Sequence, residues 1–328
     1  DYTFAQMGLG FFGNEGFFGF LDSGGKTTGP FGVGALILSM FIPLGISMFF
    51  SMAYQRKTRD LILERENTKS LEKEFNSSLF QLGNRIGNGI PPEIAFGRVA
   101  ESSKGLRTED FFRKVNYNIR QGGMSVERAI FDPRRGAINY YPSELIATSM
   151  RVLVEASKKG LSIAALSLIS ISEYVKNINK ITERLRDMLA EIISDMKSNM
   201  TFLAPLLSGI VVGLAAMITS ILNKLNVANL SETTGAVGVG NFGTILSIFD
   251  VTKMIPPYYL QLAIGIYIIQ ITFILTRALV VIDSGEDKLQ RTYLTGRNLM
   301  KGMTLYFATA LISTLLLFAL SAIVIGNF

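Results

Sequence analysis

The 328-residue sequence contains no cysteine and no histidine. Without cysteine there is no disulfide framework and no thiolate nucleophile. Without histidine, the usual zinc ligand and every imidazole acid–base mechanism are also missing. No cluster of carboxylates stands inside a hydrophobic run. We therefore expect no catalytic site, no metal site and no cofactor in this chain.

One stretch resembles a nucleotide-binding loop, but the spacing of its glycines does not match the motif. Residues 22–29 read DSGGKTTG, but Phe20 occupies the position where a P-loop needs its first glycine. No strand pattern precedes the stretch either. The sequence thus predicts no nucleotide site of its own.

Long apolar runs are abundant, and the mean hydropathy is +0.34, which is unusual for a soluble protein. Four segments lack any charge and are about long enough to cross a bilayer, which takes roughly 20 helical residues. These segments are 33–54, 201–222, 259–276 and 303–325. The sequence therefore predicts an all-α polytopic membrane protein.

The basic residues predict an orientation for these spans. Residues 55–200 hold 24 of the 32 Lys and Arg and 18 of the 26 Asp and Glu, so their net charge of +6 equals that of the whole chain. Residues 283–302 add four more cations, whereas 1–32 hold one and 223–258 hold two. Because basic loops stay in the cytoplasm, we expect both basic segments inside and both ends of the chain outside the cell membrane.

The predicted organisation is as follows. It comprises a Gly/Phe-rich extracytoplasmic or interfacial segment (1–32), transmembrane helices (33–54, 201–222, 259–282 and 303–325), a cytoplasmic helical domain (55–200) with a stalk (173–200), an extracytoplasmic loop (223–258) and a short basic cytoplasmic loop (283–302). The first residue is Asp1 rather than Met, so we expect a processed chain or a part of a longer protein.

Two apolar stripes at three- and four-residue steps predict amphipathic helices in the long basic segment. The first stripe is Leu71, Phe75, Leu79, Leu82 and Ile86. The second is Ile178, Ile181, Leu185, Met188, Ile192 and Met196, and it continues into the second span. We expect both stripes to pack into a core. A coiled-coil dimer seam over 178–196 is the alternative, although it spans few heptads.

A repeated turn separates the helices of this domain. NGIPPEIAF (88–96) and GGMSVERAIF (122–131) share a glycine, an apolar residue, Ser or Pro, and a later Glu, and GLSIAAL (160–166) is a looser copy. Gly89, Gly123 and Gly160 suit the left-handed conformation that ends a helix, and Ser125 and Ser162 suit the cap of the next one. The copies predict a compact bundle of about six helices; a 34-residue solenoid is the rival.

Three stretches of this domain resemble the type II secretion F domain family. They are LFQLGNRIGNGIPPEIAF (79–96), NIRQGGMSVERAI (118–130) and LIATSMRVLVEASKKGLSIAALSLIS (145–170), followed by the stalk and second span in the expected order. The family comprises inner-membrane platform proteins of type IV pili, type II secretion systems and the archaellum. The last two spans are more similar to the archaeal and tight-adherence branches.

The resemblance implies a non-enzymatic platform protein. Such a platform couples a hexameric cytoplasmic secretion ATPase to the extraction of pilin or archaellin subunits from the bilayer into a filament. The expected partners are that ATPase, the pilin or archaellin subunits, membrane lipids and a second copy in a homodimer. No nucleic acid is expected.

Exposed cations in turns are the candidate ATPase contacts. Arg134 and Arg135 lie in the loop DPRRGAINYYP, and Lys158 and Lys159 precede Gly160. The lysines also suit a helix C-terminus and an i,i+4 pair between Glu155 and Lys159, and the arginines also suit a solvated loop.

Gly209 and Gly213 form a GxxxG pattern in the second span, with Ala216 on the same face. Small residues allow helices to approach closely in lipid. The sequence leaves two interpretations open. One is a packing face, either in a dimer or within the chain, and the other is the general excess of glycine in membrane helices.

Three rival functions remain at this point. A membrane-anchored scaffold unrelated to pili would share the same organisation. A transporter usually needs polar or ionisable groups near the membrane midplane and broken helices arranged in repeats. These spans carry no charge there, and nearly half of the chain is one long basic segment. A membrane enzyme would need a catalytic constellation, and the sequence offers none.

Overall fold

The computed structural model describes residues 16–23, 26–224 and 255–326. The chain divides into two compact units. The span unit comprises 1–58 and 190–328, and the helical unit comprises 59–189. The predicted class is confirmed: the described chain is predominantly helical, and four of its helices are long and apolar enough to cross a membrane.

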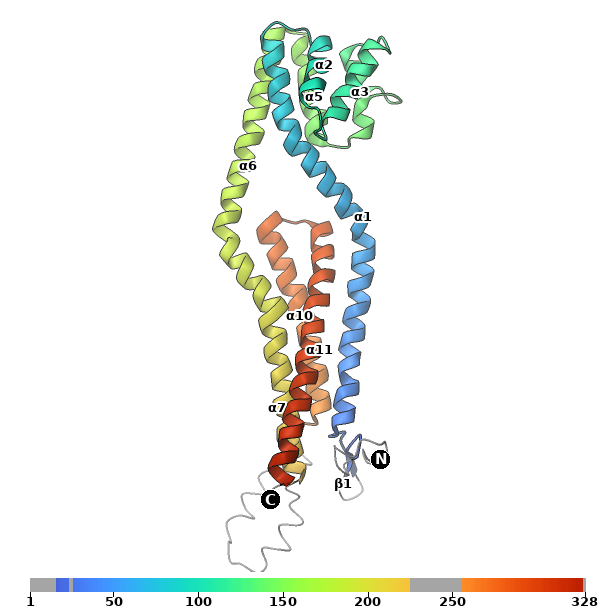
Figure 1. The fold of residues 1–328 in the computed structure, drawn as a ribbon, viewed down its shortest axis with the longest axis vertical. Coiled ribbons are helices and arrows are strands. Elements are labelled where there is room, and N and C mark those ends of the chain that lie inside the picture. Colours follow the sequence, from blue (N-terminus) through green and yellow to red (C-terminus); the bar gives the residue numbers. More distant parts are fainter. Residues whose placement is uncertain (1–15, 24–25, 225–254, 327–328) are drawn as a thin grey trace, which may run out of the picture. The chain divides into compact units, whose positions relative to one another are not determined.

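The elements follow one another along the chain in this order (Figure 1). They are β1 (Leu21–Ser23), β2 (Lys26–Thr28), α1 (Val33–Gly87), α2 (Pro92–Ser102), α3 (Glu109–Arg120), α4 (Val126–Phe131), the 3₁₀ turn η2 (Ala137–Tyr140), α5 (Glu144–Ser157), α6 (Leu161–Ser198), the π-helical turn η3 (Asn199–Leu203), α7 (Ala204–Lys224), α10 (Pro257–Ser284) and α11 (Lys288–Gly326). The two strands form a small antiparallel hairpin.

The helical unit is built around the first apolar stripe. Leu71, Phe75, Leu79, Leu82 and Ile86 on α1 are at most 7% exposed, so the predicted core packing of this stripe is confirmed. The short helices α2, α3 and α5 gather beside α1 and the beginning of α6 (Figure 1). One core cluster runs through all of them.

Aromatic rings fill the centre of that core. Phe75 stacks on Phe112 with a centroid distance of 5.8 Å, and Phe111 meets Phe112 edge-to-face at 5.3 Å. Phe111 also meets Tyr141, which follows η2, at 5.7 Å. Large rings in these arrangements bury much apolar area in a defined geometry. They tie α1, α3 and the segment after η2 into one body.

Close approach and hydroxyl contacts join α6 to α1 in the helical unit. A Cβ atom on Gly83 would lie 2.9 Å from Ile169 Cγ1, so this glycine permits the two helices to touch. One helical turn further along α6, Ser172 donates a 3.0 Å hydrogen bond to the carbonyl of Asn76. The two helices are therefore packed directly against each other at this level.

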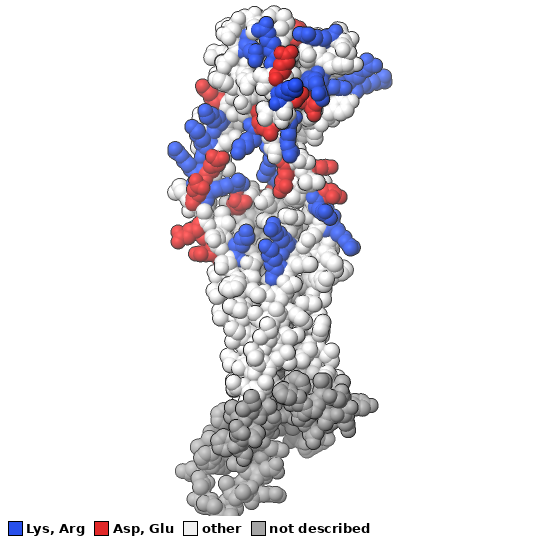
Figure 2. Space-filling model, in the orientation of Figure 1, with Lys and Arg blue, Asp and Glu red and all other residues white. Residues whose placement is uncertain are grey.

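The span unit contains the four candidate membrane helices. Its main core cluster draws Leu36 and Met40 from α1, Val212 from α7, Ile268 from α10 and Tyr306 from α11. Ser51 on α1 donates a 2.6 Å hydrogen bond to the carbonyl of Gly296 on α11. Figure 2 shows uncharged side chains along the spans, whereas lysine, arginine and carboxylate side chains cover the helical unit.

Residues 283–302 do not form the loop that the sequence predicted. Helix α10 continues to Ser284 and α11 begins at Lys288, so only a three-residue turn separates them. The first turns of α11 are buried through Thr295, Asn298 and Leu299. This packing extends the helix well before the apolar span that the sequence marks. Most of the predicted extracytoplasmic loop 223–258 and of segment 1–32 lies outside the described residues.

Candidate partner-contact surface

The three glycine turns all have backbone conformations that suit glycine. Gly89, Gly123 and Gly160 have φ values of +81°, +61° and +130°. Non-glycine residues rarely adopt such angles, because the Cβ atom then meets the backbone. After α1, the amide of Ile90 donates to the carbonyl of Arg85 across this turn. Each glycine thus stands where one helix ends and the chain reverses toward the next.

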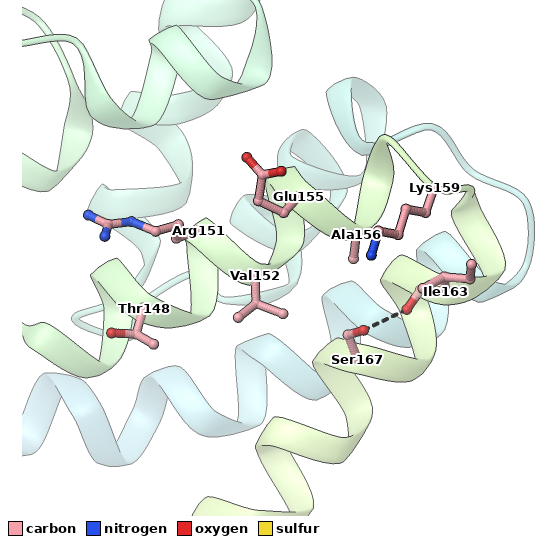
Figure 3. Close-up of a pocket in the computed structure, with 8 residues that line it drawn as sticks. All are labelled: Thr148, Arg151, Val152, Glu155, Ala156, Lys159, Ile163 and Ser167. Carbon is pink, nitrogen blue, oxygen red and sulfur yellow. Dashed lines mark hydrogen bonds between the residues drawn. The ribbon is translucent and has the colours of Figure 1, made fainter.

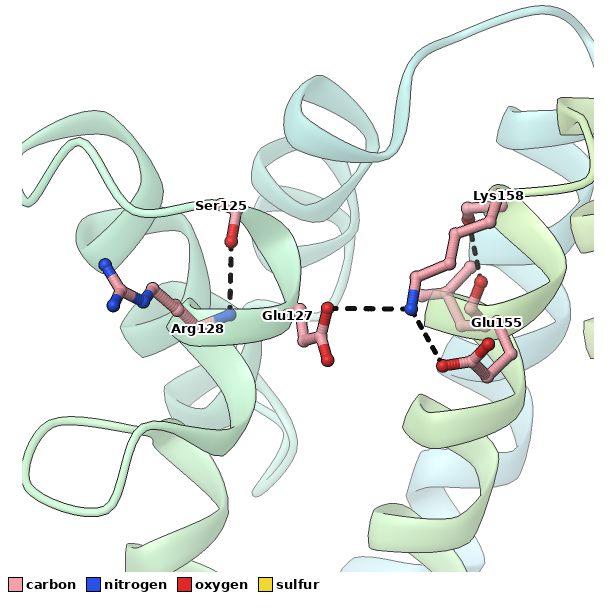
Figure 4. A network of polar contacts seen from close by, with 7 residues as sticks. Ser125, Glu127, Arg128, Glu155 and Lys158 are labelled. Atoms are coloured by element: carbon pink, nitrogen blue, oxygen red, sulfur yellow. Dashed lines mark hydrogen bonds and ion pairs between the residues drawn. The ribbon is translucent and has the colours of Figure 1, made fainter.

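The caps of the following helices differ from one another. The side chain of Ser125 accepts a hydrogen bond from the amide of Arg128 at the start of α4 (Figure 4). Pro92 is the first residue of α2. Helix α6 begins at Leu161, so Ser162 lies in its first turn and the expectation of a Ser162 cap is wrong. Gly160 precedes the helix instead, and its carbonyl accepts from the amide of Ala164.

Arg134 and Arg135 are presented by a tightly bonded turn after α4. The carboxylate of Asp132 accepts a 2.8 Å hydrogen bond from each of their backbone amides. These two hydrogen bonds lower the pKa of Asp132 below its ordinary value of 3.8, because they stabilise the charged carboxylate. The hydrogen bond from Arg135 has the larger effect, followed by that from Arg134. The side chains of Arg134 and Arg135 remain exposed.

Two further groups hold this turn in place. The buried side-chain amide of Asn118 on α3 donates to the carbonyls of Ala129 (3.0 Å) and Arg135 (2.8 Å). Position 136 has room only for glycine, because a Cβ atom there would lie 2.5 to 2.6 Å from backbone atoms of Asp132 and Ile130. The two arginine side chains are therefore carried on a backbone fixed from beneath.

Lys158 is engaged within the chain rather than free. Its ammonium lies 2.9 Å from the carboxylate of Glu155 and 3.8 Å from that of Glu127 on α4 (Figure 4). The hydrogen bond to Glu155, followed by the charge of Glu127, raises the pKa of Lys158 above its ordinary value of 10.5. The predicted i,i+4 pair is wrong in detail, because Glu155 pairs with Lys158 and not with Lys159.

Lys159 instead lines an open cavity of about 320 Å³ between α5 and α6 (Figure 3). Val152, Ala156 and Ile163 supply apolar lining, and Arg151 and Glu155 add charges along α5. The guanidinium of Arg151 also lies 5.9 Å from the centre of the Phe131 ring, within the range of a cation–π contact. Such a cavity could receive an apolar side chain next to an acidic group of a partner.

The structure thus divides the four predicted contact residues. Lys158 is paired, Lys159 lines the α5–α6 cavity, and Arg134 and Arg135 project from the turn at the other end of α4. Sequence reasoning missed Arg151, although Thr148, Arg151, Val152, Glu155 and Lys159 follow a three- and four-residue spacing along one face of α5. That spacing was the signal in the sequence for a common face, and the apolar residues elsewhere on α5 made it hard to recognise.

The GxxxG pattern of the second span is a packing face within the chain. A Cβ atom on Gly209 would collide with Thr309 and Ala310, and one on Gly213 would collide with Ser313, all on α11. Ala216, one turn further along α7, is 7% exposed and belongs to the same core cluster. The close approach of α7 and α11 therefore accounts for the two glycines, and Ala216 lies in a buried cluster to which α11 also contributes.

The second apolar stripe is not packed into a core, contrary to expectation. Ile178, Ile181, Leu185, Met188 and Ile192 expose between 44% and 77% of their surface. Only Met196, at the end of the stripe, packs in the described structure, against a cluster around Met200. Amphipathic spacing identified the apolar face correctly, but the described chain leaves most of it uncovered.

No group of three or more acidic side chains in the described residues could hold a metal ion. Comparison with protein-family models, with curated proteins and with solved structures gave no match to this chain.

Proposed function

We propose that this protein is the membrane platform of a type IV filament or a related secretion machine. In this role it couples a hexameric cytoplasmic ATPase to the extraction of pilin-like subunits from the bilayer. The helical unit is the cytoplasmic part, and the two ends of the chain lie outside. The protein performs no catalysis itself.

The observation that carries the proposal is the continuity of the helices between the two units. Helix α1 runs for 55 residues from an apolar span into the charged helical unit. The second crossing is also helical throughout, from Leu161 to Leu222 by way of the π-helical turn. No non-helical segment interrupts either helix, and we propose that these two helices transmit a displacement of the helical unit to the spans.

The glycine turns and the charge distribution support the same role. The turns at Gly89, Gly123 and Gly160, whose sequences carry the resemblance, have positive φ values and connect successive helices. Arg134 and Arg135 are exposed cations on a fixed turn, which suits an electrostatic contact with an acidic protein surface. A transporter is less well supported, because the described spans carry no ion pair or charged residue in their apolar stretches.

The test uses the full chain in lipid nanodiscs together with the secretion ATPase of the same cell. We expect the protein to bind the ATPase and change its rate of ATP turnover. Charge reversal by Arg134→Glu with Arg135→Glu should weaken binding at least tenfold, since two favourable contacts become repulsive.

The matched control is Arg98→Glu with Lys104→Glu, which changes the net charge equally at exposed positions elsewhere on the helical unit. It should leave binding nearly unchanged. Equal loss in both variants would mean a nonspecific charge effect. If the unmodified protein ignores the ATPase altogether, the platform role fails and a membrane-anchored scaffold becomes the better account.

A further inference from the structure

The side-chain amide of Gln261 on α10 is buried in the span unit without a partner. The residue is 0% exposed, and among the described residues neither its amide nitrogen nor its amide oxygen has a hydrogen-bond partner. The hydroxyl of Tyr306 donates to the backbone carbonyl of Gln261 at 3.4 Å and leaves the side chain unsatisfied. A buried amide without hydrogen bonds is costly, above all inside a membrane span. A partner within its reach is therefore expected.

Two contacts show that α1 and α10 run side by side in the same direction. A Cβ atom on Gly265 would lie 2.6 Å from ring atoms of Pro43, and the ring centroids of Phe50 and Phe273 are 6.2 Å apart. Between these two contacts α1 advances by seven residues and α10 by eight, so the helices stay in step.

This register brings Gln261 level with Ser39. Gln261 precedes Gly265 by four residues, and Ser39 precedes Pro43 by four residues. Residues four apart lie on the same face of a helix, one turn from each other. Ser39 is also 0% exposed. Gln261 and Ser39 therefore lie at one level of the interface between α1 and α10.

Pro43 deprives the backbone carbonyl of Ser39 of its usual donor. In an α-helix this carbonyl accepts from the amide four residues later, and proline has no amide hydrogen. The hydroxyl of Ser39 donates to the carbonyl of Leu36 at 2.7 Å, so it is engaged elsewhere. An acceptor that lacks its helical donor and an amide that lacks any partner thus lie at the same level of neighbouring helices.

Helix α1 is held differently on the two sides of Pro43. After the proline, Ser51 donates to the carbonyl of Gly296 on α11 at 2.6 Å, which fixes this part of α1 in position. Before the proline, Leu36 and Met40 join the span core through apolar packing. Apolar burial is not directional, and proline is a common point of bending in a helix. The segment before Pro43 can therefore change its tilt while the segment after it stays in place.

We propose that Pro43 and Gln261 form a hinge and its latch in the span unit. When the bend of α1 changes, the carbonyl of Ser39 reaches the side-chain amide of Gln261, which donates a hydrogen bond to it. The described structure has the latch open, because the amide has no partner there. The latch sets the bend of the long helix that continues into the helical unit. Every contact in this argument lies in the span unit, so the inference does not rest on the proposed function.

A double-mutant cycle in the full chain tests the pairing. Pro43→Ala supplies an amide donor to the carbonyl of Ser39 and so takes the acceptor away from Gln261. Gln261→Met keeps the length of the side chain and removes its amide. In the Pro43→Ala chain, Gln261→Met should change the unfolding equilibrium constant about tenfold more favourably than in the unmodified chain. Unfolding by dodecyl sulfate in mixed micelles measures the four constants.

Gln270→Met is the matched control for this cycle. Gln270 lies on the same helix with an exposed side chain, and the chemical change is identical. It should have the same effect with and without Pro43→Ala. If Gln261→Met also has the same effect in both chains, the proposal is overturned, because the amide then does not compete for the carbonyl that Pro43 frees.

Hydrogen exchange in nanodiscs gives a second measurement that requires no unfolding. Gln261→Met should accelerate exchange of the amides in 36–42 about tenfold in the unmodified chain, and leave it unchanged in the Pro43→Ala chain. Gln261→Asn tests whether the bond is direct: its shorter side chain should act like Gln261→Met, whereas a bridging water would preserve slow exchange. Slow exchange in the Gln261→Asn protein, or equal acceleration by Gln261→Met in both chains, overturns the latch.

Discussion

The helical unit and the span unit hold themselves together in different ways. The helical unit buries large rings, with Phe75, Phe111 and Phe112 in mutual contact at its centre. The span unit brings helices together through small residues, with Gly209 and Gly213 of α7 against α11. In water, burial of a large apolar group is itself favourable, whereas in lipid close packing must supply the stability. The difference is one of emphasis, since Gly83 lies against Ile169 in the helical unit and Tyr306 is only 1% exposed in the span unit.

The largest effect is expected in the helical unit. Phe75→Ala removes a fully buried ring and should lower the free energy of unfolding of this unit by about 3–5 kcal/mol. Hydrogen exchange of the α2 and α3 amides in nanodiscs should accelerate at least a hundredfold. Leu185→Ala is the control, because this side chain is 53% exposed and its loss should change the same amides little. Equal effects would mean that Leu185 is part of the core.

An intermediate effect is expected in the span unit. Gly213→Leu forces a side chain into Ser313 on α11, and overpacking of this kind costs about 1–3 kcal/mol or more. The apparent melting temperature in detergent should fall accordingly. Gly45→Leu on α1 is the matched control, since a Cβ atom there would meet nothing within 4 Å. A stable Gly213→Leu protein would contradict the close contact between α7 and α11.

The smallest effect tests the turn that carries Arg134 and Arg135. Asp132 has a lowered pKa, so its contribution is present above the ordinary value of 3.8 and is lost as the pH falls through the lowered value. Asp132→Ala should remove this pH dependence and speed exchange of the Arg134 and Arg135 amides at neutral pH. The rest of the helical unit should be unaffected. Unchanged exchange of these two amides would show that Asn118 and Gly136 alone hold the turn.

Sequence reasoning reached the fold because the governing signals are local. Charge-free runs of membrane length identify spans, and glycine before a capping residue identifies where a helix stops, as at Gly123 and Ser125. Sequence reasoning failed where contacts between residues far apart in the chain decide the structure. Nothing local distinguishes the start of α11 from a basic loop, and the burial of Thr295, Asn298 and Leu299 is what extends that helix.

The candidate contact surface was only partly predictable for the same reason. Arg134 and Arg135 could be identified as exposed cations from the Pro and Gly around them. The role of Lys158 could not, because its second partner, Glu127, lies on another helix, 31 positions earlier in the chain. The cavity beside Lys159 likewise requires α5 and α6 to be side by side.

By itself the sequence determined the membrane class, the position of the spans, the helical nature of the long basic segment and its turns. Only the tertiary structure decided what each apolar face touches. The stripes of α1 and α6 have the same spacing, yet Phe75 is fully buried and Met188 is 77% exposed. Periodicity shows that a face favours burial, but the burial itself depends on which surfaces the rest of the chain brings to it.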